Sequence, residues 1–248
     1  MSIESEGDLI GLARVGKIVA LTLREMEKQV EPGITTAELD RIGEEFLERH
    51  GARSGPRLVY KFPGANCISV NSEAVHGIPG ERVIAAGDVV KLDVTAELGG
   101  YMADAAITVL VPPVTPGMRK LANCASQALE KGINAARAGR PIFEIGRAVE
   151  SEVKRQGFTV LRELVGHGVG RSIHEDPQIP NYFDRRANQR LPEGLVITIE
   201  PIISAGTSWT VEEDDGWTLK TLDDSLAAHF EHTMVITRGR PILLTALA

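Results

Sequence analysis

The sequence has 248 residues, enough for one large domain or two smaller ones. Hydrophobic residues make up 43% and charged residues 25%, ordinary values that argue against a disordered chain, a collagen-like fibre or a coiled coil. With 34 acidic and 27 basic residues the formal net charge is −7, which excludes a bulk attraction for nucleic acid or anionic lipid. The 2 cysteines indicate no disulfide framework. We expect a cytoplasmic protein with no specific nucleic-acid or membrane partner, because the acidic start is unlike a secretory signal and no apolar stretch approaches about 20 residues.

Two helices are expected near the start of the chain. Apolar residues recur at helical spacing over 5–30, and a Pro-Gly pair at 32–33 ends that helix. Thr35 begins a capping-box pattern that starts a second helix, which ends at Gly51.

A β-rich stretch follows these helices. It contains a short strand over 67–70, and the segment 83–90 leads into a longer strand. The Gly-Gly pair at 99–100 is a hairpin turn signal, after which 101–111 returns as the partner strand.

The second half of the chain repeats this order. The expected elements are helices over 115–137 and 141–155 and strands over 195–203 and 230–237. Two helices precede β-rich residues in each half, with glycines at matching spacing. We interpret this as an internal duplication, with structural halves of about 1–114 and 115–248 in a single catalytic domain, 1–248, of α+β class. Chance glycine spacing is the alternative.

Two aspartates interrupt the apolar strands of the expected hairpin. Asp93 lies in the run VVKLDV and Asp104 in ADAAI, although aspartate is disfavoured in strands and a buried unpaired carboxylate is costly. If the chain turns between Leu98 and Gly99, the two aspartates stand directly opposite one another, with Cβ atoms about 5 Å apart. A register slip of two makes them diagonal neighbours. Both arrangements favour a shared cation, whereas a wet sheet edge is the alternative.

Glutamates and histidines add to this set. Glu200 closes one apolar strand and Glu231 precedes another, while His167 lies in the small-residue segment GHGVG. His174 and His76 are flanked by turn residues. Each taken alone is also compatible with a strand-end charge or a loop histidine. The spacing is that of neither the helical HExxH zinc motif nor the GxGxxG dinucleotide fingerprint.

Four carboxylates and one imidazole describe a hard, oxygen-rich metal site. One ion does not need that much negative charge, whereas two divalent ions about 3.5–4 Å apart and bridged by shared carboxylates do. Such a pair acidifies a bridging water and polarises a carbonyl. A glutamate can then move the proton and flanking histidines can hold an oxyanion. The set therefore indicates amide hydrolysis.

In chain order, these residues resemble the metallopeptidases of the pita-bread fold. The motifs that carry the resemblance are Asp93, Asp104, GHGVGxxxHExP from Gly166, IEP from Ile199 and EHT from Glu231. Two further motifs, CISVNxxxxHGIP from Cys67 and DGWT from Asp215, narrow the resemblance to type I methionine aminopeptidases. It covers essentially the whole chain.

The resemblance implies a fold, an activity and partners. The fold is a duplicated α+β unit, with two pseudo-symmetric halves around a central antiparallel sheet. The activity is removal of the initiator methionine from nascent polypeptides, preferably when the second residue is small, with two divalent ions (Co, Mn, Fe or Zn) as cofactors. We expect a monomer, and association with the ribosome stays open.

Site residues follow from the same resemblance. The implied metal ligands are Asp93, Asp104, His167, Glu200 and Glu231, of which Asp104 and Glu231 bridge the ions. Asp93 then serves one ion, while His167 and Glu200 serve the other. The implied catalytic residues are His76, His174 and Glu200, the last as proton shuttle. The implied substrate-binding residues are His76, His174, Phe62, Cys67 and Trp217.

Three positions depart from the family pattern. Val59 stands near where a tyrosine is expected, Ile173 where an aromatic is common, and Val75 where a cysteine often precedes the motif histidine. These departures leave the side-chain preference of the pocket open. One rival function is a related Xaa-Pro peptidase, and another is a non-catalytic binder on the same fold. The intact ligand positions favour the enzyme over the binder.

Overall fold

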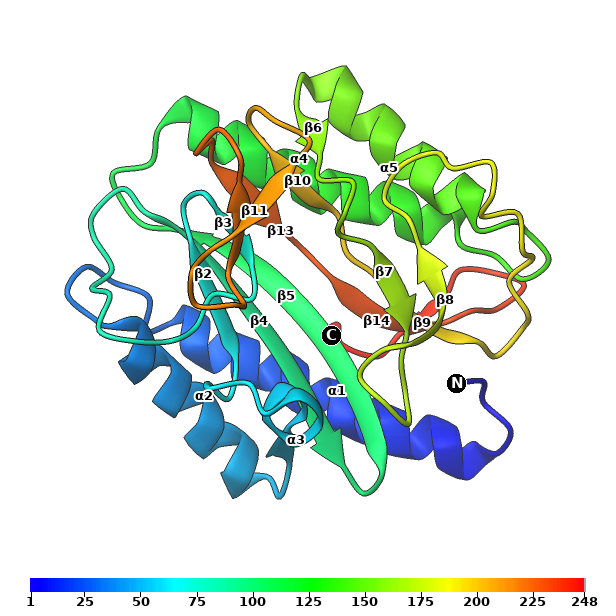
Figure 1. The fold of residues 1–248 in the computed structure, drawn as a ribbon. Helices are drawn as coiled ribbons and strands as arrows, with labels where there is room; N and C mark the ends of the chain where they lie inside the picture. The colour runs from blue at the N-terminus through cyan, green and yellow to red at the C-terminus, as the bar shows by residue number, and fades with distance from the viewer. Residues whose placement is uncertain (248) are drawn as a thin grey trace.

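The computed structural model describes residues 1–247, in which helices and antiparallel strands mix as the α+β prediction requires. Two pairs of helices lie outside a layer of strands (Figure 1). One pair, α1 (Glu6–Glu27) and α2 (Thr36–Arg49), comes from the start of the chain. The other, α4 (Pro116–Ala135) and α5 (Phe143–Gln156), comes from its middle. A short helix, α3 (Gly55–Tyr60), was not expected.

The long helices α1, α2 and α4 begin where the capping signals predict, whereas α5 begins without a side-chain cap. Ser5 and Thr35 each accept a hydrogen bond from the third residue of the following helix, whose acidic side chain accepts one from the capping residue in return. Thr115 caps α4 ahead of a proline. Gly157 ends α5 in the left-handed conformation, with φ of 84°.

The strands in the described residues are short apart from one hairpin. They are β1 (Arg53–Ser54), β2 (Cys67–Val70), β3 (Glu73–Val75), β4 (Val89–Leu98), β5 (Tyr101–Leu110), β6 (Thr159–Val160), β7 (Gly166–Gly168), β8 (Glu175–Ile179), β9 (Val196–Ile199), β10 (Ile202–Ser204), β11 (Thr210–Glu212), β12 (Leu219–Thr221), β13 (Ala227–His229), β14 (His232–Val235) and β15 (Ile242–Leu243). Val83 forms only an isolated bridge with Thr35 and belongs to no strand.

The β4–β5 hairpin has the slipped register rather than direct opposition of the aspartates. Asp93 pairs with Ala106, and Thr95 pairs with Asp104. Gly99 and Gly100 both have positive φ, 60° and 84°. The turn therefore centres between the two glycines, as a tight hairpin turn with two left-handed central residues requires. Direct opposition was the wrong choice, and the diagonal arrangement is confirmed.

The two strands expected at 195–203 and 230–237 are each broken in the middle. Pro201 lacks an N–H and cannot continue the ladder, so β9 ends before Glu200 and β10 starts after Pro201. The antiparallel segment that pairs with these strands is interrupted at the same level, between β13 and β14. Ile199 pairs with His232 and Ile202 pairs with His229. β9 and β14 belong to a five-stranded sheet, whereas β10 and β13 belong to a three-stranded one.

A seam of hydrogen bonds joins β5 to this broken pair of strands, and the strands run side by side in Figure 1. The Thr233 hydroxyl accepts from the backbone N–H of Asp104 at 2.8 Å and donates to its carbonyl at 2.7 Å. The Glu231 N–H donates to the Ala106 carbonyl at 3.0 Å. Residues distant in sequence are thereby brought to one place.

Apolar packing holds the layers together. One buried cluster joins α1 and α2 to β4 and β5, and it includes Val19, Leu39 and Leu92. Another joins α4 and α5 to β9 and β14, and it includes Ile133, Val149 and Ile197.

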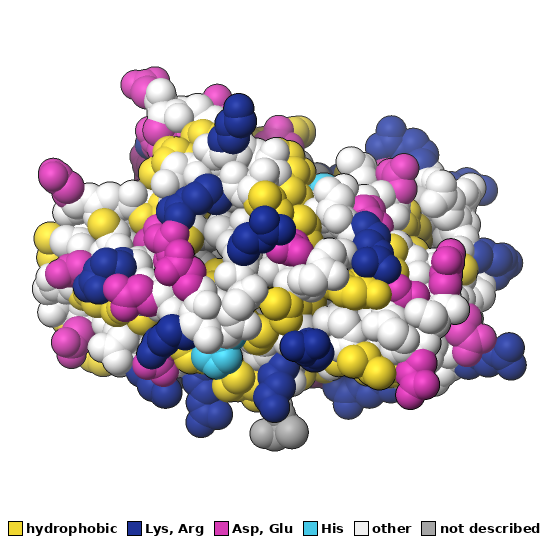
Figure 2. Space-filling view, turned by 90° about the horizontal axis from the view of Figure 1, so that it is seen from below, with side chains coloured by type: hydrophobic (Ala, Val, Ile, Leu, Met, Phe, Trp, Pro, Cys, Tyr) yellow, Lys and Arg dark blue, Asp and Glu magenta, His cyan; other side chains and the backbone are white. Residues whose placement is uncertain are grey.

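The surface of the molecule is charged. Acidic and basic side chains are interspersed on the face shown in Figure 2. No helix among residues 1–247 is long and apolar enough to cross a membrane.

Candidate metal centre

A cavity of about 200 Å³ opens where the β4–β5 hairpin meets the broken strands. Its lining residues are Val75, His76, Asp93, Asp104, Glu163, Leu164, Val165, His167, His174, Glu200, Ile202 and Glu231. The structure thus brings together the five residues expected as metal ligands and two expected to contact substrate.

The two aspartates share one face of the hairpin. Asp93 and Asp104 sit at diagonal register positions, and Asp104 is 6% exposed. Burial, followed by the neighbouring Asp104 carboxylate, raises the pKa of Asp93 well above its usual value. Burial also raises the pKa of Asp104 to about 6. Like charges this close favour a proton or a cation between them.

The two glutamates occupy the break in the other ladder. Because Ile199 pairs with His232 and Ile202 with His229, Glu200 stands opposite Glu231 in the gap. Both are buried, and burial followed by the Asp104 charge raises the pKa of each well above its usual value. The Thr198 hydroxyl donates to Glu200 Oε1 at 3.0 Å.

His167 faces the carboxylates through one ring nitrogen. Its Nε2 lies 3.4 Å from Glu200 Oε1 and 4.0 Å from Asp104 Oδ2. Its Nδ1 is 2.9 Å from the Gly168 carbonyl, so that nitrogen carries the proton and Nε2 presents a lone pair. Burial lowers the pKa of His167 to about 3, which keeps the ring neutral as a ligand must be.

The glycines beside His167 have a steric purpose. A Cβ on Gly168 would lie 2.3 Å from the Asp176 carbonyl oxygen, and one on Gly166 would lie 2.7 Å from the Thr198 carbonyl oxygen. Only glycine lets β7 approach its neighbours this closely. The two glycines therefore let β7, which carries His167, pack closely against β8 and β9.

His76 and His174 flank the carboxylates. His76 has a positive φ of 58° in the turn after β3, and burial lowers its pKa to about 4. The His174 ring lies edge-on to the His167 ring, with centroids 4.2 Å apart. Its pKa is also lowered by burial, although the residue remains exposed at the rim. Both histidines are therefore neutral near pH 7.

The other expected substrate-binding residues lie outside the cavity lining. Cys67 is buried and pairs with Asp93 across β2 and β4. Burial, followed by the Asp93 charge, raises the pKa of its thiol well above the usual value, so the thiol is protonated. Phe62 and Trp217 pack edge to face with centroids 5.2 Å apart. The two rings contact each other rather than forming the wall of this cavity.

The gathered groups fit divalent cations. Asp104 Oδ1 and Glu231 Oε1 are buried oxygens without a hydrogen-bond partner in the described residues, and such groups are costly unless something binds them. Ligand atoms of Asp104, His167 and Glu231 lie within 4.8 Å of one another. Oxygens with an imidazole nitrogen suit Mn, Fe, Co or Zn.

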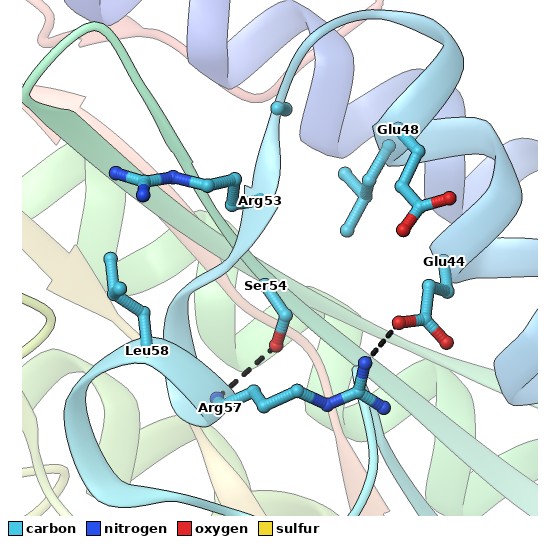
Figure 3. A pocket seen from close by; sticks show the side chains of 8 residues that line it. Glu44, Glu48, Arg53, Ser54, Arg57 and Leu58 are labelled. Atoms are coloured by element: carbon cyan, nitrogen blue, oxygen red, sulfur yellow. Dashed lines mark hydrogen bonds and ion pairs between the residues drawn. The ribbon is translucent and has the colours of Figure 1, made fainter.

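A second cavity, of about 350 Å³, contains no comparable set. It lies between α2 and α3, where Arg57 forms an ion pair with Glu44 (Figure 3). Its lining residues are Glu44, Leu47, Glu48, Ala52, Arg53, Ser54, Arg57 and Leu58. Of its two carboxylates, that of Glu44 is already neutralised by a guanidinium, and the lining offers no histidine or cysteine beside Glu48.

Comparison with known proteins identifies the family. The model of metallopeptidase family M24 matches residues 11–238. The chain belongs to metallopeptidase family M24. It is 46% identical over 249 aligned residues to methionine aminopeptidase 2 of Bacillus subtilis, covering 100% of both chains. The resemblance to methionine aminopeptidases is therefore confirmed.

Solved structures agree with this M24 assignment and confirm the pita-bread fold. Methionine aminopeptidase from Thermotoga maritima matches with a TM-score of 0.96 and 36% identity, covering 100% of each chain. A prolidase from Pyrococcus furiosus matches with a TM-score of 0.79 and 22% identity, covering 99% of this chain and 66% of that one. The second match shows a shared fold alone.

Two residues at this M24 site were missed by the sequence analysis. His229 is 1% exposed, and its Nε2 lies 3.7 Å from Glu231 Oε2 and 3.9 Å from Glu200 Oε2. Neither ring nitrogen has a hydrogen-bond partner in residues 1–247. The available signal was strand alternation, which places His229, two residues before Glu231, on the same face as that glutamate. The other missed residue, Tyr60, lies 2.6 Å from a ring nitrogen of His174 through its hydroxyl oxygen. The signal for it was the tyrosine expected near position 59, which the sequence analysis treated as absent because of Val59.

Proposed function

We propose that this chain is a dinuclear-metal aminopeptidase that removes the N-terminal methionine from nascent polypeptides, preferably when the second residue is small. The observation that carries the proposal is the cavity where three buried carboxylates, the half-buried Asp93 and the His167 imidazole converge. The 46% identity to a protein named methionine aminopeptidase supports the substrate.

The proposed ligands are Asp93, Asp104, His167, Glu200 and Glu231, holding two divalent ions (Mn, Fe, Co or Zn). Asp104 and Glu231 are the proposed bridges, because each has a buried oxygen without a partner in the described residues. Bound ions of this kind acidify water and polarise a carbonyl. The Thr198 hydroxyl orients the Glu200 carboxylate through Oε1, which suits Glu200 to move a proton within the cavity.

The flanking histidines are proposed to act on the scissile peptide. His76 and His174 line the cavity next to the carboxylates, and a neutral imidazole there can donate a hydrogen bond to a developing oxyanion. Phe62, Cys67 and Trp217 are the proposed methionine pocket. The edge-to-face contact of Phe62 with Trp217 supports this, because it fixes two aromatic surfaces for a thioether side chain.

The wider setting belongs to the same proposal. The carboxylates of the cavity come from both halves of the chain, between residues 93 and 231. We therefore propose one catalytic domain, 1–248, with halves of about 1–114 and 115–248. We propose a monomer in the cytoplasm, where new chains emerge. The seam between β5 and the broken strands supports the single domain. Ribosome association is testable by cosedimentation.

The test is methionine release from Met-Ala-Ser by protein stripped of metal and then reloaded with one divalent metal at a time. Release should be absent after chelation and should return with metal. Absence of release under every metal would refute the proposal, provided that metal binding is shown by calorimetry.

A substrate panel separates the related Xaa-Pro activity. Met-Ala-Ser should be cleaved and Ala-Pro should not. Preference for Ala-Pro would assign the chain to the rival specificity while leaving the metal chemistry intact. A Met-Leu peptide serves as the control for the second residue, because the proposal requires slower cleavage there.

A further inference from the structure

Tyr60 contacts the His174 ring at the rim of the cavity. The Tyr60 hydroxyl oxygen lies 2.6 Å from His174 Nδ1, and the ring centroids are 5.6 Å apart. This distance is that of a well-formed hydrogen bond. Nothing in the metal chemistry requires Tyr60, so its contact with a cavity residue needs an explanation of its own.

The backbone holds Tyr60 in place. It is the last residue of α3, and Lys61 turns the chain with φ of 59°. Ser54 caps the start of α3, accepting from the Arg57 N–H at 3.2 Å, and its hydroxyl donates to the Ala65 carbonyl at 2.7 Å. Arg57 is paired to Glu44 of α2, as Figure 3 shows. A helix of six residues is thus fixed at its start and along one side.

A neutral histidine has one nitrogen that donates and one that accepts. If Tyr60 donates to Nδ1, the ring proton must be on Nε2. Partial burial raises the pKa of Tyr60, so its hydroxyl keeps the proton that it donates. The Nε2–H then belongs to a ring that lines the cavity.

We propose that Tyr60 is a positioning residue that donates its hydroxyl proton to Nδ1 of His174 and holds the imidazole as the Nε2–H tautomer, ready to donate to the substrate carbonyl. This inference rests on the proposed function for its substrate. Tyr60 is 42% exposed, so the pair is open to solvent until a bound peptide covers it. Exclusion of water strengthens the hydrogen bond between Tyr60 and His174 while the substrate is bound.

The first test reads the tautomer directly. Nitrogen-15 NMR of the histidines in the wild-type and Tyr60→Phe proteins should show His174 protonated at Nε2 in the wild type and a mixture of tautomers in the variant, with His174→Gln used to assign the signal. A wild-type His174 protonated at Nδ1, or an unchanged spectrum in Tyr60→Phe, would overturn the proposal. This readout stands even if methionine is not the substrate.

The second test is a double-mutant cycle on methionine release. Tyr60→Phe should lower kcat about tenfold with KM unchanged, the equivalent of one net hydrogen bond. In a His174→Ala background the same change should have no further effect. Additive losses would show that Tyr60 acts independently of His174 and would contradict the proposal. Tyr182→Phe, which removes a hydroxyl from a ring beneath Arg162, should match the wild type.

Discussion

The two acidic pairs of the site are built differently. Asp93 and Asp104 stand at diagonal positions of an unbroken hairpin, where strand alternation sends both short side chains to one face. Glu200 and Glu231 stand opposite one another where two strands break and change sheets. The longer glutamates reach into the cavity from irregular backbone. The register of the hairpin therefore fixes the aspartates. The glutamates are fixed by the strand pairs on the two sides of the break.

This difference predicts that catalysis depends most on the pair at the break. Glu200→Gln keeps the size and the contact with Thr198 but removes the carboxylate that moves the proton. Turnover should fall by about 10²–10⁴-fold with little change in KM. Steady-state kinetics on Met-Ala-Ser with metal occupancy measured in parallel checks this, and exposed Glu193→Gln is the matched control. Near-native kcat with metal bound would show that Glu200 carries no proton.

The hairpin pair should contribute a pH-dependent part of the stability in the absence of metal. The pKa of Asp104 is raised from 3.8 to about 6 in the folded protein, so the folded state holds the proton more tightly than the unfolded chain. Its stabilising effect is complete below about pH 4 and is lost as pH rises through 6. The loss is about 3 kcal/mol, since each pKa unit corresponds to about 1.4 kcal/mol.

Urea unfolding of metal-free wild type and Asp104→Asn between pH 4.5 and 7 measures this effect. The stability difference between the two proteins should change with pH in the stated direction. Added divalent metal should restore wild-type stability most strongly at pH 7, because the ligands bind metal only when deprotonated. A pH-independent difference would mean that Asp104 is already ionised in the metal-free fold.

The same contrast explains what the sequence could predict. Helix starts and the hairpin could be predicted, because their signals act over only a few residues. These signals are the capping residues, such as Ser5 and Thr35, and the Gly-Gly turn. The exact register was not, because it depends on both turn glycines adopting positive φ. The diagonal placement survived only as the second choice.

The rest of the site depends on tertiary contacts. Glu200 and Glu231 were found as charges at strand ends, but the shared break that sets them opposite was hidden by apolar runs that continue through it. His229 and Tyr60 were missed because their meaning comes from what they face. No local pattern connects Tyr60 with His174, which lies on a distant segment of the chain.

His229 offers a way to sharpen the comparison, since its Nε2 faces both glutamates at the break. His229→Leu introduces an apolar side chain of similar size and removes both ring nitrogens. Divalent metal affinity should fall about 10–100-fold, the usual cost of losing a group next to the ligands. Calorimetric titration with Mn²⁺ measures this, and His229→Gln should retain most of the affinity because it keeps a donor. Equal affinities in all three proteins would refute a role at the metal.

The smallest expected effect concerns the seam that joins the two pairs. Thr233→Val preserves shape but removes the hydroxyl that bonds both the N–H and the carbonyl of Asp104. Two buried backbone groups then lack partners, which should lower the free energy of unfolding by about 2 kcal/mol. Urea denaturation measures it, with Thr237→Val as control, since the Thr237 hydroxyl donates to the Arg240 carbonyl in an exposed turn. Because Thr233 holds the Asp104 backbone and no part of its carboxylate, metal affinity should fall less than in His229→Leu. A larger fall in affinity than in stability would mean that the seam positions the carboxylate itself, and the hairpin pair would then depend on the second half of the chain as well as on its own register.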